Sequence, residues 1–260
     1  MRRTPYIFIL ALISLLGSCS GEMPTQEQGS GEGRFHLSII TAAVSTEDIT
    51  RASVFEFDTD TFKVTVTDAK GLELITKKEN AQFTDADRTL PTANDYKIEV
   101  ESCSESEAVA YNNAWGKERF YAQTTFDIAT DETTPLALEC TMANAGLVVI
   151  FDNSFVTKFP THAVTTQDVR NLVFKSSDES AVAYYNTDQP TVVVSIRLTG
   201  SAGGWSDRID MTRDVPLTKG KITRLRVKYN DGTNTDSDVN IDIDTDTSMG
   251  ESDDEVTVVS

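Results

Sequence analysis

The chain has 260 residues, with 41 acidic residues against 23 lysines and arginines, which gives a formal net charge of −18. Such a surface repels nucleic-acid phosphates and anionic lipid headgroups, so the composition argues against a nucleic-acid partner and suits a soluble exported protein. The length allows one large domain or two domains of ordinary size.

Residues 1–18 have the layout of a secretory signal peptide, in which a short basic segment precedes an apolar run at 6–16. The run is too short to cross a bilayer as a helix. It ends in Leu-Gly-Ser-Cys at 16–19, which resembles the bacterial lipobox. The resemblance implies cleavage before Cys19 and lipidation of its thiol. We therefore expect an outer-membrane, lipid-anchored protein on the cell surface. The alternative is an ordinary signal peptide with an incidental cysteine.

The first half of the mature chain reads as a tether followed by short strands. Residues 19–33 are almost devoid of apolar side chains, as in a flexible tether. Alternation of apolar and polar residues, bounded by turn residues, then predicts strands at 35–39, 62–67, 72–75, 96–101, 120–128 and 134–141. Residues 104–118 are polar and are predicted to form an irregular connection or a short helical turn. We expect a domain boundary in the small residues at 142–146.

The second half follows the same pattern. Strands are predicted at 147–151, 169–174, 181–185, 191–199, 205–211, 222–229 and 239–243, with one helical turn within 153–159. The continuous apolar run at 147–151 indicates a strand that is covered on both faces or packed at a domain junction.

Short strands without a long helical pattern predict an all-β fold of two tandem antiparallel β-sandwiches. The expected N-terminal domain spans 34–144 and the C-terminal domain 145–246. Residues 247–260 are expected to be an acidic tail or an edge strand.

Two cysteines follow Cys19, namely Cys103 and Cys140. An even pair in an exported chain is a candidate disulfide. The alternative is a pair of buried free thiols.

No catalytic or cofactor motif is visible in the sequence. His36 and His162 are the only histidines and lie far apart, so neither a histidine triad nor a zinc site is supported. Four aspartates and one asparagine fall at alternate positions, which in a strand places them on one face: Asp238, Asn240, Asp242, Asp244 and Asp246. The spacing fails the EF-hand pattern. We expect a solvated face that discourages edge pairing, with weak Ca²⁺ binding as the alternative. The predictions are no enzyme, no cofactor and no metal.

Aromatic residues offer a possible stacking platform for a glycan. The candidates are Tyr111, Trp115, Tyr121, Tyr184, Tyr185 and Trp205. Packing in the core or on a sheet face is the more common role of such residues.

Several segments together resemble a known family. They are Phe-His-Leu-Ser-Ile at 35–39, Thr-Arg-Ala at 50–52, Phe-Lys-Val-Thr-Val-Thr-Asp-Ala-Lys-Gly at 62–71, Leu-Pro-Thr-Ala-Asn-Asp-Tyr at 90–96, and a segment from Cys140 that ends in Val-Val-Ile-Phe-Asp. They resemble a fimbrillin-like family of Bacteroides-type surface lipoproteins defined only as a domain of unknown function. The resemblance implies two transthyretin-like or immunoglobulin-like sandwiches that act in adhesion or fimbria-like assembly, with a glycan-binding accessory lipoprotein as the alternative.

The resemblance also implies a mode of assembly. In fimbrillin relatives a trypsin-like protease cuts after an arginine near the mature N-terminus, and a strand from a neighbouring molecule fills the exposed groove. Arg51, followed by Ala52, is the matching position here, and the strand at 35–39 is the removable one. The alternative, which we favour, is that Arg51 is an exposed loop residue. The resemblance therefore leaves open a protein partner that binds by strand addition.

Overall fold

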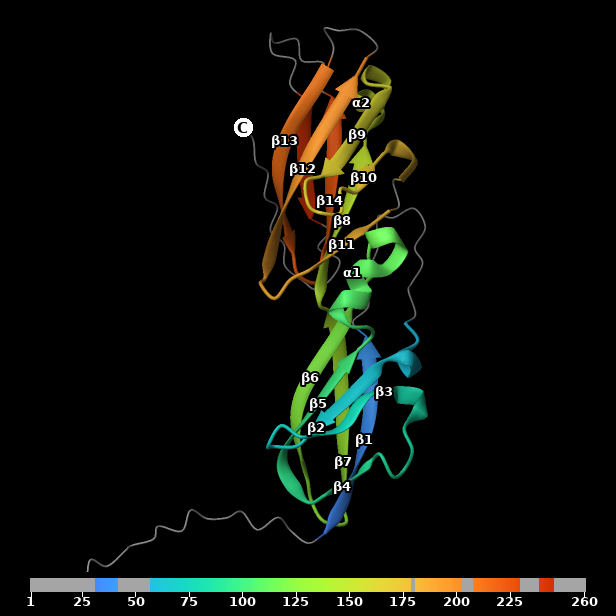
Figure 1. Cartoon of the computed structure of the whole chain (residues 1–260), viewed down its shortest axis with the longest axis vertical. Helices are drawn as coiled ribbons and strands as arrows, with labels where there is room; N and C mark the ends of the chain where they lie inside the picture. Colours follow the sequence, from blue (N-terminus) through green and yellow to red (C-terminus); the bar gives the residue numbers. More distant parts are fainter. Residues whose placement is uncertain (1–30, 42–56, 179–180, 203–207, 230–238, 246–260) are drawn as a thin grey trace, which may run out of the picture.

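A computed structural model of the chain describes residues 31–41, 57–178, 181–202, 208–229 and 239–245. Within these residues the chain is predominantly strand and forms two β-rich lobes placed end to end (Figure 1). The predicted all-β sandwich fold is confirmed. None of the helices in the described part of the chain has the length and apolar character needed to span a bilayer.

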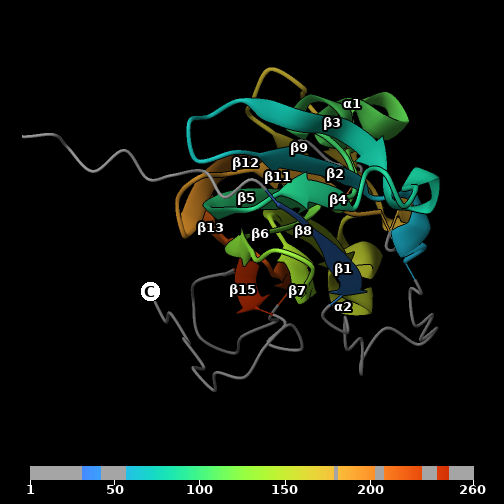
Figure 2. The ribbon, with the colours of Figure 1, turned by 90° about the horizontal axis from the view of Figure 1, so that it is seen from below.

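The N-terminal lobe is one seven-stranded sheet folded over on itself. Its strand order is β3-β2-β5-β6-β7-β1-β4. Strands β6 and β7 pair only at Phe120–Met142 and Tyr121–Thr141, so the sheet bends there into two layers, and Figure 2 shows this lobe end-on. The strands are β1 (Glu32–Thr41), β2 (Lys63–Thr67), β3 (Glu73–Glu79), β4 (Thr89–Pro91), β5 (Ala93–Glu101), β6 (Phe120–Ile128) and β7 (Thr133–Met142).

Alternating burial explains the core between these layers. Every second residue is buried in β2, and in β1 from Gly33 to Leu37, because successive side chains of a strand point to opposite faces. The core includes Phe35, Val64, Ile98, Phe120 and Leu138. The connections of this lobe contain two short 3-10 turns, η1 (Thr59–Thr61) and η2 (Asn80–Gln82), and are followed by the helix α1 (Glu105–Ala114). A further 3-10 turn, η3 (Ser176–Asp178), lies in the C-terminal lobe.

The C-terminal lobe consists of two four-stranded sheets, β10-β9-β12-β13 and β11-β8-β14-β15. Its core includes Val149, Phe174, Ile196 and Leu225. Strand β8 is buried at almost every position, as its continuous apolar run predicts. The elements are β8 (Asn144–Phe151), α2 (Asn153–Lys158), β9 (Thr161–Thr166), β10 (Val173–Phe174), β11 (Ala183–Asn186), β12 (Thr191–Ser201), β13 (Arg208–Thr218), β14 (Ile222–Tyr229) and β15 (Val239–Thr245).

The sheets are mixed rather than wholly antiparallel. Strand β1 pairs in parallel with β7 from Arg34–Thr133 to Thr41–Cys140, and β8 pairs in parallel with β14. In both lobes the first strand therefore lies beside a strand that comes late in that half of the chain. A parallel pair needs a long crossover connection, so local alternation predicted the strands and gave no sign of this pairing.

Other departures are local. Strand β9 was not predicted, because Val164 is its only strongly apolar residue. Residues 169–172, predicted as strand, form a turn, and β13 continues to Thr218 where the prediction ended at 211. The stretch at 104–118, predicted as an irregular connection or a short helical turn, contains the helix α1. The helical turn predicted within 153–159 is α2.

The expected disulfide is not formed in the structure, where Cys103 and Cys140 are both free and buried. Cys140 lies in the core of the N-terminal lobe, whereas the thiol of Cys103 lies 3.9 Å from the carbonyl oxygen of Glu118. Burial raises the pKa of both thiols, that of Cys140 to about 11. They are buried free thiols, the alternative considered above.

Several predictions fall outside the described residues. These concern Cys19, Arg51, Ala52, Trp205 and the segment 247–260. The domain limits also stay predictions. Strand β7 of the N-terminal lobe ends at Met142, and β8 of the C-terminal lobe begins at Asn144.

Candidate functional site

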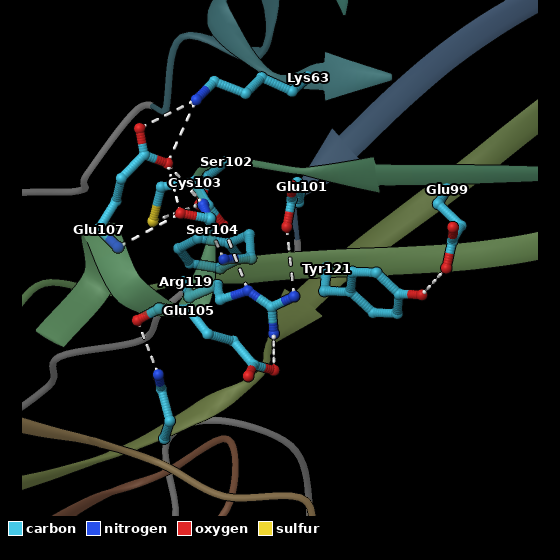
Figure 3. A network of polar contacts seen from close by, with 12 residues as sticks. Lys63, Glu99, Glu101, Ser102, Cys103, Ser104, Glu105, Glu107, Arg119 and Tyr121 are labelled. Carbon is cyan, nitrogen blue, oxygen red and sulfur yellow. Dashed lines mark hydrogen bonds and ion pairs between the residues drawn. The ribbon is translucent and has the colours of Figure 1, made fainter. Parts of the chain in front are cut away.

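The site lies where the two lobes meet, and it is built on α1. The helix begins with a capping box, in which the Ser104 hydroxyl accepts the Glu107 backbone N–H at 3.3 Å and the Glu107 carboxylate accepts the Ser104 N–H at 2.8 Å. This exchange satisfies two backbone donors that a helix start leaves unpaired. Lys63 of β2 donates to the same carboxylate at 3.1 Å, so the helix start is fastened to the sheet (Figure 3).

The chain reverses after the first turns of α1. Asn112, Asn113 and Ala114 have positive φ angles, a conformation that asparagine tolerates better than most residues. Gly116 follows at φ +86°, and a Cβ there would lie 3.0 Å from both the Ala108 carbonyl oxygen and the Tyr184 Cβ. Glycine is therefore required where the reversal passes against the C-terminal lobe.

The reversal inserts Trp115 into the other lobe. The indole packs against the core of the C-terminal lobe and meets the Phe174 ring edge-on, with centroids 4.8 Å apart. The Trp115 carbonyl oxygen accepts the Tyr184 N–H at 2.7 Å.

Strand β11 makes the reciprocal contribution. Ala183 and Tyr185 belong to the core of the C-terminal lobe, while Tyr184 between them belongs to the core of the N-terminal lobe. The alternation of a strand lets one segment fill two cores. The Tyr184 hydroxyl also donates to the Glu118 carboxylate. Burial, with the charge and hydrogen bond of Glu118, raises the pKa of Tyr184.

Two further side chains connect backbone groups across the junction. Asn144 is fully buried; its Oδ1 accepts the Arg119 N–H at 3.2 Å and its Nδ2 donates to the Lys117 carbonyl at 2.8 Å. Arg170 donates to the carbonyl oxygens of Ala114 at 3.2 Å and Tyr184 at 2.8 Å.

The surroundings of Arg170 hold its side chain in place. Its guanidinium forms an ion pair with Asp168 at 3.0 Å and lies 3.9 Å from the centre of the Tyr185 ring. A planar guanidinium suits this combination of stacking and forked hydrogen bonding better than lysine would.

Arg119 organises the polar side of the junction (Figure 3). Its guanidinium contacts the carboxylates of Glu101 and Glu105, both at 3.3 Å, and its Nε donates to the Cys103 carbonyl at 3.2 Å. It also lies over the Tyr121 ring, 5.1 Å from the centroid. The backbone of Glu105 accepts a hydrogen bond from Asn186 of β11 at 2.7 Å, which ties this network to the C-terminal lobe.

Glu99 and Tyr121 extend the network along the outer face of β5 and β6 (Figure 3). The Tyr121 hydroxyl donates to Glu99 at 2.6 Å, and Lys97 pairs with the same carboxylate at 2.9 Å. Burial raises the pKa of Glu99, but these hydrogen bonds and the charges of Lys97 and Arg119 outweigh it and leave that pKa below its ordinary value. The pKa of Tyr121 is raised by burial and by Glu99.

These groups line a groove of about 400 Å³ that Asp188 and Lys219 complete from the C-terminal lobe. Glu99, Glu101, Glu105 and Arg119 already hold partners of opposite charge. These ion pairs all lie within the N-terminal lobe, and Asp188 and Lys219 add one charge of each sign from the C-terminal lobe. In the described part of the chain, no group of three or more His, Cys, Asp and Glu residues is placed to hold a metal ion.

The residues considered in the sequence fall in different places. His36 lies in β1 and His162 in β9, in different lobes. Trp115, Tyr184 and Tyr185 are packed in or against the cores, so they do not form an exposed stacking platform.

Sequence reasoning missed the contributions of Asn144, Arg170 and the Trp115–Tyr184 contact. The Asn-Asn-Ala-Trp-Gly run at 112–116 was the signal that could have indicated a left-handed reversal.

Comparisons with known proteins give one family match. The model of a family described as a domain of unknown function, DUF4493, matches residues 31–260. A comparison with curated protein sequences finds no match.

Among the solved structures that match, two cover most of the chain at low sequence identity and low TM-score. A fimbrial assembly protein from Parabacteroides distasonis is 13% identical with a TM-score of 0.40, over 82% of this chain and 100% of that one. The fimbrial anchor protein Mfa2 from Porphyromonas gingivalis is 12% identical with a TM-score of 0.38, over 81% and 97%. At these values the overlap does not assign a role to the chain.

Proposed function

The chain belongs to the DUF4493 family, and from its architecture we propose that it is a non-enzymatic, lipid-anchored surface protein that serves adhesion or fimbria-like assembly. Cys19 is the proposed lipid attachment point, and the outer membrane is the proposed location. The family match agrees with the expected membership of a family known only as a domain of unknown function. The role itself rests on the geometry below.

The observation that carries the proposal is where β1 begins. Strand β1 (Glu32–Thr41) begins at the end of the N-terminal lobe farthest from the C-terminal lobe (Figure 1). A chain held at Cys19 would therefore keep the N-terminal lobe toward the membrane and present the C-terminal lobe outward. The interlocked junction supports this role, because it makes the two lobes a continuous rod.

A partly uncovered strand supports a protein partner that binds by strand addition. Strand β4 pairs with β1 only at residues 32–34, while β7 covers the other side of β1 as far as Thr41. Among the described strands, none pairs with residues 36–41 on the β4 side. Such an edge can accept an extended segment through backbone hydrogen bonds.

Anchoring is tested by fractionating cells that express the wild-type chain or Cys19→Ala. We expect the wild-type chain to stay in the membrane fraction after a salt wash and Cys19→Ala to leave it, because acyl chains hold a protein on a membrane through the methylenes that they bury. Ser18→Ala is the matched control, since it keeps a small residue before the cysteine and should remain anchored.

Protease treatment of intact cells, with mass spectrometry of the mature N-terminus, tests exposure and processing together. Loss of the chain and an N-terminus at a lipidated Cys19 are the expected results. An N-terminus at Ala52 would instead show cutting after Arg51 and a temporary anchor. A Cys19→Ala protein that stays membrane-bound would refute the anchor.

A further inference from the structure

A second recess lies on the N-terminal lobe, beside the first half of β1. It has a volume of about 390 Å³, and its lining includes Arg34, His36 and Arg88, with Asp85 as the one acidic residue of that lining. The chain as a whole carries a net charge of −18. A recess with two arginines and a histidine is therefore a local exception to the charge of the molecule.

The wall that carries Arg88 is fixed by its own hydrogen bonds. The Asp87 carboxylate accepts the Thr84 backbone N–H at 2.7 Å and pairs with Lys78 at 2.6 Å. The Arg88 carbonyl oxygen accepts the Phe35 N–H at 3.0 Å, which joins this segment to β1. The recess is thus bordered by ordered backbone on both sides.

The Phe83 ring supports the guanidinium of Arg88. It lies 5.8 Å from the Arg88 Cζ and also 5.8 Å from the Lys78 Nζ, and it packs edge-on against Phe35 in the core. Lys78 is neutralised by Asp87, whereas Arg88 forms no ion pair with any residue that the structure describes. Its forked donors are available to a ligand.

The interactions of the Arg34 guanidinium are weak. Its guanidinium lies 3.4 Å from Asp85, whose side chain is 85% exposed, and an ion pair in such contact with water is weak. Its Nε donates to the Thr89 hydroxyl at a long 3.4 Å. A stronger anion could therefore displace Asp85 from Arg34.

We infer that this recess binds a phosphate group. Arg34 of β1 and Arg88 of the segment before β4 both line the recess, and their guanidinium groups suit the oxygen geometry of phosphate, which arginine binds through paired hydrogen bonds. Thr133, on the β7 side of the same recess, adds a hydroxyl donor. Arg34 is two residues from the start of β1, so the recess lies near the end of the N-terminal lobe that is farthest from the C-terminal lobe. The phosphate can belong to a lipid headgroup or to a soluble phosphorylated compound.

The test titrates inorganic phosphate into the unlipidated full-length mature chain, Cys19→Ala, and follows binding by calorimetry at low ionic strength. We expect Arg88→Gln to weaken binding about tenfold, since it removes a charge-assisted donor. Asp85→Asn should tighten binding about threefold, because Arg34 then loses its competing carboxylate. Lys175→Gln, which removes an exposed charge from the C-terminal lobe, is the matched control and should change nothing.

The gain expected for Asp85→Asn guards against a misleading result, because a misfolded variant loses affinity and does not gain it. Absence of phosphate binding, or equal affinities for wild type, Arg88→Gln and Asp85→Asn, would overturn the inference. Neither result bears on anchoring, because the protein used carries no lipid.

A second measurement identifies the source of the phosphate. The same protein is sedimented with phosphatidylcholine vesicles that contain or lack phosphatidic acid. Binding to the phosphatidic acid vesicles that inorganic phosphate reverses supports a lipid headgroup. Phosphate binding without vesicle binding supports a soluble phosphorylated ligand.

Discussion

Glu107 does three things with one carboxylate. It closes the capping box with Ser104 and forms an ion pair with Lys63 of β2. Its negative charge also lies in the first turn of α1, where the helix dipole is positive. The backbone and side-chain hydrogen bonds of Ser104, with that of Lys63, lower the pKa of Glu107 from 4.5 to about 2. One surface residue therefore ties the junction helix to the N-terminal sheet.

Replacing Glu107 should change how stability depends on pH. The folded-state pKa lies below the ordinary value, so ionised Glu107 stabilises the fold above pH 4.5, and this contribution is lost as the pH falls toward 2. Glu107→Gln should therefore be less stable than wild type at pH 7, and the difference should shrink on acidification. Urea unfolding between pH 7 and pH 2 measures this difference.

The matched control is Glu139→Gln, which removes the same charge from the exposed face of β7. A difference between Glu107→Gln and wild type that stays constant down to pH 2 would contradict the proposed role of the carboxylate.

At the scale of the element, the C-terminal strand β15 shows what register adds to a sequence pattern. The alternating acids were expected on a solvated face that discourages edge pairing, and β15 is an edge strand. Its register places Asp244 opposite Arg224 and Asp242 opposite Arg226 of β14. On β14, the residues at these two register positions are thus both basic.

Reversing one of these charges should weaken the β14–β15 pair. In Arg224→Glu a carboxylate would lie directly opposite Asp244, and like charges at such positions cost up to about 1 kcal/mol. The expected result is a lower melting temperature by calorimetry, partly restored by high salt. Lys70→Glu, in the exposed turn between β2 and β3, is the matched control. A melting temperature of Arg224→Glu equal to that of the control would rule out the effect.

For the whole molecule, the exchange of Trp115 and Tyr184 between the two cores is the dominant feature. Arg170 bonds the two backbone segments that carry these side chains. The two lobes are therefore joined by side chains packed into each other's cores and by hydrogen bonds.

Removing Arg170 should loosen that junction. Arg170→Ala leaves the carbonyl oxygens of Ala114 and Tyr184 without this donor, at an expected cost of about 2–3 kcal/mol. We expect a lower melting temperature and a broader distribution of molecular lengths in small-angle X-ray scattering. Arg197→Ala, which breaks an exposed ion pair with Asp210 within the C-terminal lobe, should leave the scattering unchanged. Identical scattering from both variants would show that Arg170 does not hold the lobes together.

Much of the fold followed from sequence because strand alternation and turn residues act over a few residues. The apolar positions of β2, β5 and β12 were readable in this way. The candidate site was not, since Tyr184 and Tyr185 are adjacent in sequence yet fill different cores. Local patterning shows that both faces of β11 are apolar, but it cannot say which surface each face meets.

By itself, the sequence of this protein determined most of its strands, its acidic character and the predicted address at Cys19, all of which depend on composition or on neighbouring residues. Only the tertiary structure decided the parallel pairing of β1 with β7, the free state of Cys103 and Cys140, and the gathering of Arg34 and Arg88 around one recess. These features join residues that are far apart in the chain. They depend on how the sheet folds over and how the lobes meet, which local chemistry does not specify.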